Sequence, residues 1–388
     1  MEFEPWWLLV LPLLFVAGWF ARGADRRIQS RDEAAAPRSM FRGLNLLLNE
    51  KPDQAIDAFI EVVRLDPETI ELHYALGSLF RRRGEIERAV RIHNYLLNRA
   101  DLPARERSSA LAELAQDYLK GGLLDRAEDA FGRLVGERQH RFAALRALLS
   151  IYEMEGEWAK AIDTAGTLVG EAGETHAKSI AHFHCELAER AIAAGQADVA
   201  RQELERALAT DRHSVRALAL RGDLQKRQGD RDAAIASWEA VEREAPQYLS
   251  LVADRLAAAL DDAGRRDEAL AMLMRNLREQ PSIDALDLAF QRTLAWRGAQ
   301  EAEALLRDEL PRKPSLLGFE RLLELRSAAA NGDPELESLR ALIRTQVRKL
   351  ARYRCGHCGF RARDFHWQCP GCKNWDSYPP RRIEEVEG

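Results

Sequence analysis

Cysteine and proline are scarce in this chain of 388 residues, which contains 5 cysteines and 14 prolines. So few cysteines argue against the class of small secreted proteins that disulfide bonds hold together. No charge of one sign dominates either, because the formal net charge is only -5. This balance argues against a protein that coats nucleic acid along its whole length. The scarcity of proline leaves long stretches rich in Ala, Leu, Glu and Arg, which favour helices.

Sequence signatures of common catalytic sites are absent as well. No phosphate-binding P-loop, GxGxxG fingerprint, GxSxG elbow or HExxH motif occurs in a suitable context. His182, His184 and Cys185 lie close together in one segment. A buried cysteine beside two solvated histidines is the simplest interpretation of that segment. We therefore expect that the chain is not an enzyme.

Glycine recurs at a regular interval through the middle of the chain. Consecutive turn glycines lie 38, 34, 39, 34, 35 and 34 residues apart, and a period near 34 is that of the tetratricopeptide repeat, a helix-turn-helix unit. Alanine recurs five residues after each turn position, where the two helices of a unit cross closely. The glycines are Gly84, Gly122, Gly156, Gly195, Gly229, Gly264 and Gly298, and the alanines are Ala55, Ala89, Ala127, Ala161, Ala200, Ala234 and Ala269. The pattern predicts an all-α solenoid of about eight repeats.

Two units match the repeat pattern at further positions. Gly222 allows close approach of two helices, and Trp238 fills the space between them. Gly43 and Phe59 have the same roles in the other unit. Glu303 stands where the small residue belongs, so we expect a degenerate unit there.

The concave face of such an array is where we expect a peptide or a protein to bind, and the first helices of the repeats line it. We interpret the run from Arg81 to Arg83 mainly as a solvated helix end. The possible contacts on two first helices are His73, Tyr74, Arg81, Arg82, Arg216, Arg221, Gln225 and Lys226.

The N-terminal residues form a long uncharged run. Residues 5–21 contain no charged side chain, and a helix of that length spans about 26 Å, enough for the hydrocarbon core of a bilayer. Trp6, Trp7 and Trp19 lie near its ends, where indole rings prefer the membrane interface. Positive charges follow the run rather than precede it, which favours an uncleaved anchor over a cleaved signal peptide. The positive-inside rule then places the rest of the chain in the cytoplasm.

Four of the five cysteines form two CxxC knuckles near the C-terminus. Cys355 and Cys358 are followed, after ten residues, by Cys369 and Cys372. Two such knuckles can hold one tetrahedral metal ion through four thiolates. A reducing compartment such as the cytoplasm keeps the thiols available. The segment is too short and polar to bury a core of its own, so we expect the ion to hold it together.

This knuckle pair resembles a rubredoxin-type domain or a zinc ribbon. Rubredoxins hold iron for electron transfer, and the loop between their knuckles is usually much longer than the ten residues found here. We therefore expect zinc rather than iron, although four thiolates accept either ion. Gly359 and Gly371 are expected to permit the tight turns. The aromatic residues expected to seal a small core are Phe360, Phe365, Trp367 and Trp375.

The patterns divide the chain into consecutive segments with different roles. We predict a transmembrane anchor at residues 1–21, a linker at 22–38, tetratricopeptide repeats at 39–315, terminal helices at 316–352, the tetracysteine module at 353–377 and a tail at 378–388.

This order of parts resembles the lipopolysaccharide assembly protein B family of Gram-negative bacteria. The most specific parts of the resemblance are the membrane-like start and the YRCGHCGF…CPGC end. The resemblance implies a regulatory adaptor in the bacterial inner membrane, with one span, a periplasmic N-terminus and a cytoplasmic bulk. Such an adaptor presents the lipid A pathway deacetylase to a membrane-bound ATP-dependent protease, and a further inner-membrane protein that senses lipopolysaccharide can block it. Only the four cysteines carry over as functional residues.

Three other functions remain open at this point. A non-proteolytic scaffold for lipopolysaccharide assembly enzymes would have the same architecture. A nucleic-acid-binding ribbon is suggested by the last 45 residues, where ten Lys or Arg face five Asp or Glu, but the anchor argues against a nucleic-acid partner. An electron carrier would require iron in the tetracysteine module.

Overall fold

The computed structural model describes residues 70–330 and 333–384, together with residues 54 and 60. Helices follow one another from residue 70 to residue 350, and the residues from 351 onward form a small sheet and the loops that join its strands. The chain divides after Gly156 into two compact units. The predicted anchor at 1–21 and linker at 22–38 lie outside the described residues, and within the described part no helix is long and apolar enough to cross a bilayer.

In the first unit each helix packs against the next one along the chain. Leu111, Phe131 and Leu148 belong to its buried core, together with several alanines. The helices are α3 (Ile70–Arg82), α4 (Ile86–Leu97), α5 (Ala104–Lys120), α6 (Leu124–Leu134) and α7 (Arg141–Glu155).

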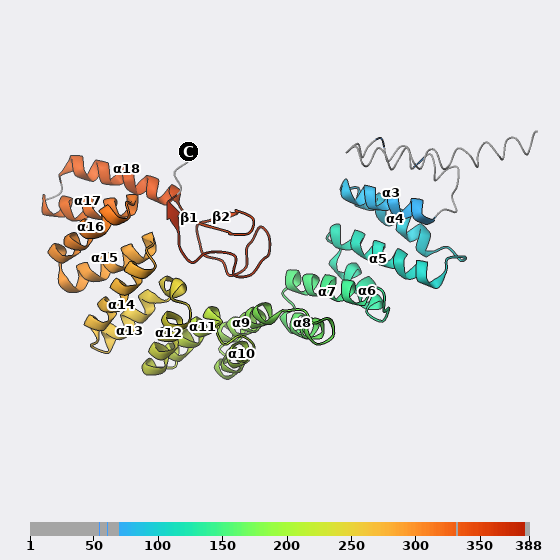
Figure 1. Cartoon of the computed structure of the whole chain (residues 1–388), viewed down its shortest axis with the longest axis horizontal. Helices are drawn as coiled ribbons and strands as arrows, with labels where there is room; N and C mark the ends of the chain where they lie inside the picture. The colour runs from blue at the N-terminus through green and yellow to red at the C-terminus, as the bar shows by residue number, and fades with distance from the viewer. Residues whose placement is uncertain (1–53, 55–59, 61–69, 331–332, 385–388) are drawn as a thin grey trace, which may run out of the picture. The chain divides into compact units, whose positions relative to one another are not determined.

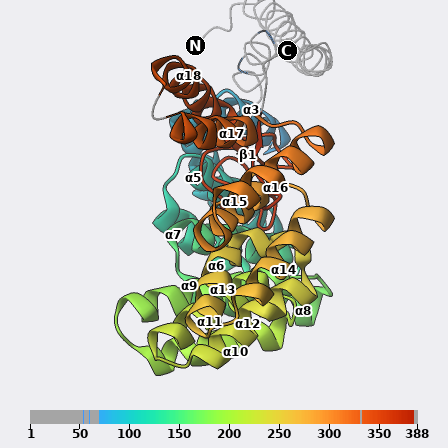
Figure 2. The same ribbon diagram turned by 90° about the vertical axis from the view of Figure 1, so that its left-hand side faces the viewer.

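The second unit continues the array of paired helices and ends in the tetracysteine module. The helices from α9 onward follow one another around the module in Figure 1, and Figure 2 shows α10 to α17 in order from a direction at right angles. The helices are α8 (Trp158–Ala172), α9 (Ala177–Ala193), α10 (Ala197–Thr210), α11 (Val215–Arg227), α12 (Arg231–Glu244), the 3-10 helix η1 (Pro246–Leu251), α13 (Ala253–Asp262), α14 (Arg266–Glu279), α15 (Ile283–Arg297), α16 (Ala299–Arg312), α17 (Leu316–Ala329) and α18 (Pro334–Leu350).

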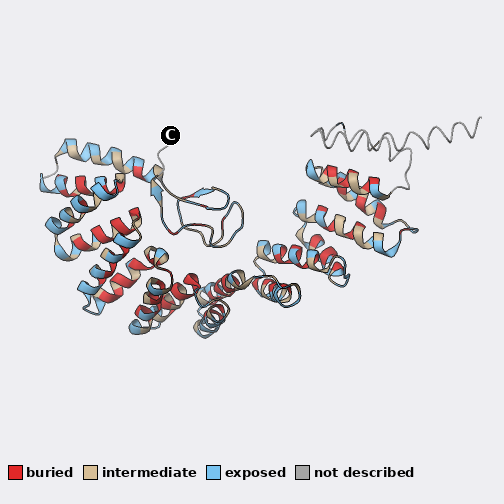
Figure 3. Ribbon diagram, in the orientation of Figure 1, coloured by how far each residue is buried: buried red, intermediate tan, exposed pale blue. Residues whose placement is uncertain are grey.

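The repeat pattern expected from glycine and alanine is confirmed. All seven predicted turn glycines have positive φ angles, between 70° and 92°. Ala127, Ala200 and the other predicted crossing alanines among the described residues are fully buried. Figure 3 shows the buried residues on the helix faces that meet neighbouring helices. A larger side chain at these crossings would force the two helices of a repeat apart.

The close approach predicted at Gly222 is also confirmed. A Cβ atom built on Gly222 would lie 2.4 Å from Nε1 of Trp238, which is fully buried. A second pair, which the sequence did not reveal, has the same geometry: a Cβ atom on Gly77 would lie 2.3 Å from Nε2 of His93. In both repeats a ring of the second helix fills the space that a glycine of the first helix leaves open.

The degenerate unit expected around Glu303 is not degenerate at its helix crossing. Helix α16 begins directly after Gly298, whereas α14 begins two residues after Gly264. The crossing position therefore falls one residue earlier, on Ala302, which is fully buried. Glu303 is half-buried beside the crossing and pairs with Arg307 on the same helix and with Arg326 on α17.

Charged residues on the first helices link consecutive repeats. The interpretation of Arg81 as part of a solvated helix end is wrong, because Arg81 on α3 pairs with Glu113 and the buried Asp117 on α5. Comparable pairs, 32 to 38 residues apart, occur in the second unit. They join Arg255 to Asp223, Arg292 to Asp254 and Arg321 to Asp287. Each pair joins the first helices of successive repeats.

Replacing Gly222 with Ala tests the role of close helix approach. The new methyl group collides with the Trp238 ring, and we expect the substitution to lower the free energy of unfolding by about 1–3 kcal/mol. Gly166 on α8 is the matched control, because a Cβ atom there meets nothing within 4 Å. Gly166→Ala should be neutral or stabilising by up to about 1 kcal/mol, since alanine is the better helix former. Thermal unfolding followed by circular dichroism measures both, and equal effects of the two substitutions would contradict the interpretation.

Candidate metal centre

The two knuckles are local turns built on the same backbone pattern. The N–H of Cys355 donates to the carbonyl of Phe360 at 2.9 Å, and the N–H of Cys369 donates to the carbonyl of Asn374 at 2.9 Å. In return, the N–H of Gly359 donates to the carbonyl of Cys355, and the N–H of Lys373 donates to the carbonyl of Cys369. The two knuckles are thus matching five-residue loops, each of which presents two sulfur atoms from one side.

Strands close the first of these loops. Strand β1 (Ala351–Arg354) pairs in antiparallel orientation with β2 (Arg361–Ala362) on one side and with β3 (Ile383–Glu384) on the other. An isolated antiparallel bridge between Gln368 and Trp375 closes the second loop. The ten-residue connection between the knuckles therefore starts and ends in fixed backbone pairs.

One turn residue differs from the sequence expectation. Gly359 has the expected positive φ of 76°, but in the second knuckle Lys373 takes the left-handed conformation, with φ 61°. Gly371 is needed for a different reason. A Cβ atom on it would lie 3.2 Å from the Phe360 ring, so glycine leaves room for the first knuckle to pack on the second.

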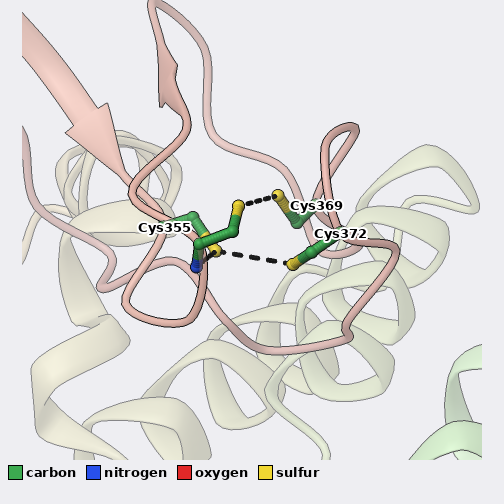
Figure 4. Close-up of side chains that lie close together, drawn as sticks. Cys355, Cys369 and Cys372 are labelled. Atoms are coloured by element: carbon green, nitrogen blue, oxygen red, sulfur yellow. Dashed lines mark hydrogen bonds between the residues drawn. The ribbon is translucent and has the colours of Figure 1, made fainter. Parts of the chain in front are cut away.

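The four sulfur atoms converge on one point. All four Sγ atoms lie within 4.8 Å of one another. Across the knuckles, Cys355 Sγ lies 3.8 Å from Cys372 Sγ, and Cys358 Sγ lies 3.7 Å from Cys369 Sγ. A tetrahedral ion with metal–sulfur bonds of about 2.3 Å requires sulfur–sulfur separations of about 3.8 Å. Figure 4 shows the sulfur atoms of Cys355 and Cys372 turned toward each other, and this donor set fits zinc and iron alike.

The thiols differ in how readily they ionise. Burial alone would raise the pKa of Cys355, but hydrogen bonds from Ser377 and from the backbone N–H groups of Cys358 and His357 outweigh it and lower the pKa to about 6. The pKa of Cys372 is raised to about 12. A hydrogen bond from the backbone of Asn374 favours its thiolate, but burial and the neighbouring cysteines oppose a further negative charge. A cation among the sulfurs removes this conflict, and its binding releases the remaining protons.

The module has a small core that extends beyond the predicted boundary. Cys355, Cys369 and Tyr378 are buried in it, and Phe365 packs against them. Tyr378 is fully buried, and its hydroxyl lies 3.9 Å from Cys369 Sγ. We expected residues from 378 onward to form a tail, but those described, up to residue 384, complete the core and add strand β3.

Trp375 and Trp367, both expected to seal this core, pack on the repeats, and Trp367 also meets the Phe365 ring edge-on with centroids 4.9 Å apart. The Trp375 ring stacks on His182 of α9, with ring centroids 4.5 Å apart and planes inclined by 15°. The Trp367 ring stacks on Tyr248 of η1, with centroids 6.1 Å apart. The interface between the module and the array is therefore partly aromatic, while Phe360 remains exposed to solvent.

Polar contacts fix the module at other helices. Arg382 forms a salt bridge with Asp284 at the start of α15, at 2.6 Å. The Glu384 carboxylate accepts hydrogen bonds at 2.7 Å from the N–H groups of Leu316 and Leu317. These are the first residues of α17, where a carboxylate interacts favourably with unpaired N–H groups and with the helix dipole. The module is thus held by α9, η1, α15 and α17 together.

The interpretation of His182 and His184 as solvated side chains is wrong. Both are buried, and only Cys185 lies where we expected it, in the core between α9 and its neighbours. His184 Nδ1 lies 2.7 Å from Glu203 on α10. His182 Nε2 lies 3.0 Å from the Asp376 carboxylate of the module. The sequence showed only that histidines cluster here, not that the module would cover one of them.

Arg216 was expected as a contact on the open groove and is instead part of the same interface. Its side chain is 5% exposed and pairs with Glu186 and Glu189 of α9. Its guanidinium carbon lies 5.9 Å from the Trp375 ring centroid, within range of a cation–π interaction. The module therefore packs against an ion-pair cluster of the array.

Comparison with known proteins agrees with both parts of the structure. A family described as "Rubredoxin metal binding domain" matches residues 353–379, and the tetratricopeptide repeat family matches residues 42–101, 112–173 and 185–248. Lipopolysaccharide assembly protein B of Escherichia coli (strain K12) is 34% identical over 378 residues, which are 96% of this chain and 97% of that protein. The chain belongs to the lipopolysaccharide assembly protein B family.

The family match extends to a more distant relative. Lipopolysaccharide assembly protein B of Haemophilus influenzae is 29% identical over 390 residues, covering 97% of this chain and 98% of that protein. The match therefore covers nearly the whole of both chains. The solved structure of Naa15/Naa10 bound to HypK-THB is 15% identical, covers 84% of this chain and 63% of that chain, and has a TM-score of 0.41.

Thiol reactivity tests the assignment of the ligands. Burial raises the pKa of Cys185 to about 12, so this thiol stays protonated and inert at pH 8. We expect the metal-loaded protein to show no reactive thiols, the chelated protein four, and the unfolded protein five. Mass-spectrometric counting of alkylated cysteines measures this, and alkylation of Cys185 before any ligand would contradict it.

Replacing Trp375 with Ala tests the docking of the module. Loss of the ring removes its stacking on His182 and its contact with Arg216, and an aromatic pair of this kind contributes about 0.5–1.5 kcal/mol beyond the area it buries. We expect amide exchange in residues 353–384 to become at least tenfold faster while the metal content stays unchanged. Arg363→Ala is the control, because this side chain belongs to the same module but is exposed to solvent. Unchanged exchange in Trp375→Ala would show that the polar contacts alone hold the module.

Proposed function

We propose that this chain takes part in lipopolysaccharide assembly as a non-enzymatic adaptor at the bacterial inner membrane. It binds the lipid A pathway deacetylase and presents it to a membrane-bound ATP-dependent protease. The observation that carries the proposal is the 34% identity to lipopolysaccharide assembly protein B of Escherichia coli across 96% of this chain. Other inner-membrane proteins that assemble or sense lipopolysaccharide are further partners in this proposal.

The chemistry of the described residues supports a binding role. Buried charged groups such as Asp117 and Arg216 are engaged in links between helices. The thiol of Cys185 is buried and protonated, and the remaining cysteines converge on the metal centre. A solenoid of this kind offers an extended surface to a folded protein.

Membrane attachment supports the pairing of client and protease. In the proposal residues 1–21 form a single span with a periplasmic N-terminus, and the bulk of the chain is cytoplasmic. An adaptor fixed in the same membrane as a protease raises their effective concentration without any new contact. Zinc is the proposed ion, because it stabilises a small tetrathiolate module without redox chemistry.

The half-life of the lipid A deacetylase in cells depleted of this protein tests the proposal. We expect the half-life to lengthen several-fold and to be restored by the wild-type chain. Cys369→Ser should fail to restore it, because loss of one ligand unfolds the metal module. Cys185→Ala, which removes a cysteine outside the metal centre, is the control and should restore it.

The opposite result separates the adaptor from a scaffold. A half-life that does not change on depletion would reject the proteolytic role and leave a scaffold that assembles lipopolysaccharide enzymes. Normal turnover with Cys369→Ser would instead show that client delivery does not require the metal module.

A further inference from the structure

A hollow of about 770 Å³ lies where strand β3 meets the loop between α16 and α17. Leu286 and Leu310 contribute to its apolar lining. Phe319 and Ile383 also line it and are 43% and 39% exposed. A volume of this size is typical of ligand pockets, and exposed apolar side chains at a hollow indicate a binding surface.

Two cations at this hollow lack a carboxylate partner. Lys313 and Arg381 line it and form no ion pair among the described residues, although the Lys313 ammonium donates to the Pro281 carbonyl. Partial burial, followed by repulsion from Arg381, lowers the pKa of Lys313. The acidic groups of the hollow are already engaged, Glu309 with Arg312 and Glu384 with the start of α17. The hollow therefore has an excess of positive charge.

The same surface continues onto the first metal knuckle. A second hollow of about 530 Å³ shares Arg381 and Ile383 with the first and is also lined by Arg354 and His357. Arg354 is exposed and forms no ion pair within the described part of the chain. We call the continuous region of Lys313, Phe319, Arg354, Arg381 and Ile383 the β3 surface.

Strand β3 itself offers a place for an extended chain. The order of the sheet is β2-β1-β3, so β3 is paired on one side only within the described sheet. An unpaired strand edge can accept the backbone of another extended segment, whose side chains then enter neighbouring pockets. Apolar side chains would enter the hollow of about 770 Å³, and acidic ones would meet the cations beside it.

We propose that the β3 surface binds an extended segment of a partner protein in which acidic and apolar side chains alternate. The site does not depend on whether the bound partner is degraded, and so it goes beyond the adaptor proposal. It also gives the metal a role in recognition, because the ion fixes the knuckle that carries part of the β3 surface.

Fluorescence anisotropy with the full-length, metal-loaded protein tests the proposal. The probe is a fluorescein-labelled hexapeptide of alternating leucine and glutamate, and the control probe alternates leucine and lysine. We expect the acidic probe to bind at least tenfold more tightly than the basic one. Lys313→Glu combined with Arg381→Glu should weaken its binding at least tenfold, and Phe319→Ala about fivefold.

The matched control reverses two other exposed cations of the same unit. Lys178 and Arg212 are exposed, line neither hollow and form no ion pair among the described residues. Lys178→Glu combined with Arg212→Glu should change binding less than twofold, and thermal unfolding and metal content verify the fold of every variant. Equal affinity for both probes, or equal losses in the two double variants, would overturn the proposal. Binding of dodecanoate without binding of the acidic probe would overturn it too and indicate a small anionic amphiphile.

Discussion

Four sulfur atoms within 4.8 Å of one another cannot all carry a negative charge unless a cation lies among them. The module has little else to hold it, since its buried core consists mainly of cysteines, Ala362 and Tyr378. The ion therefore fixes the two knuckles relative to each other. Through the knuckles it also fixes the residues beyond them, Trp375, Asp376 and Arg382, which contact the array.

The array, by contrast, depends on no single group. Each repeat contributes a small residue at the helix crossing, and some of its charged residues pair with the next repeat, as Arg255 does with Asp223. Stability in such arrays is approximately a sum of repeat and nearest-neighbour terms. The module is the exception to this local order, because its contacts reach α9, η1, α15 and α17 at once.

Local patterns were predictable from the sequence, and long-range partners were not. Spacing in the sequence was enough to predict close helix approach at Gly222, the helix crossings at the alanines and the metal ligands of the paired CxxC motifs. His182 and Trp375 are 193 positions apart in the chain, so nothing in the sequence around His182 indicates that an aromatic ring covers it. Tyr378 was missed for a related reason, since a tyrosine followed by two prolines is typical of a tail. Glu303 was misinterpreted because α16 begins one residue earlier after its glycine than the other helices do.

The positions of the docking contacts have a mechanical consequence. A solenoid curves through small rotations between neighbouring repeats. A module that contacts α9 through His182 and α17 through Glu384 spans several repeats and restrains all of those rotations together. We expect this restraint to weaken when the metal is removed, because the ion fixes the two knuckles relative to each other and the contacting residues follow the knuckles in the chain.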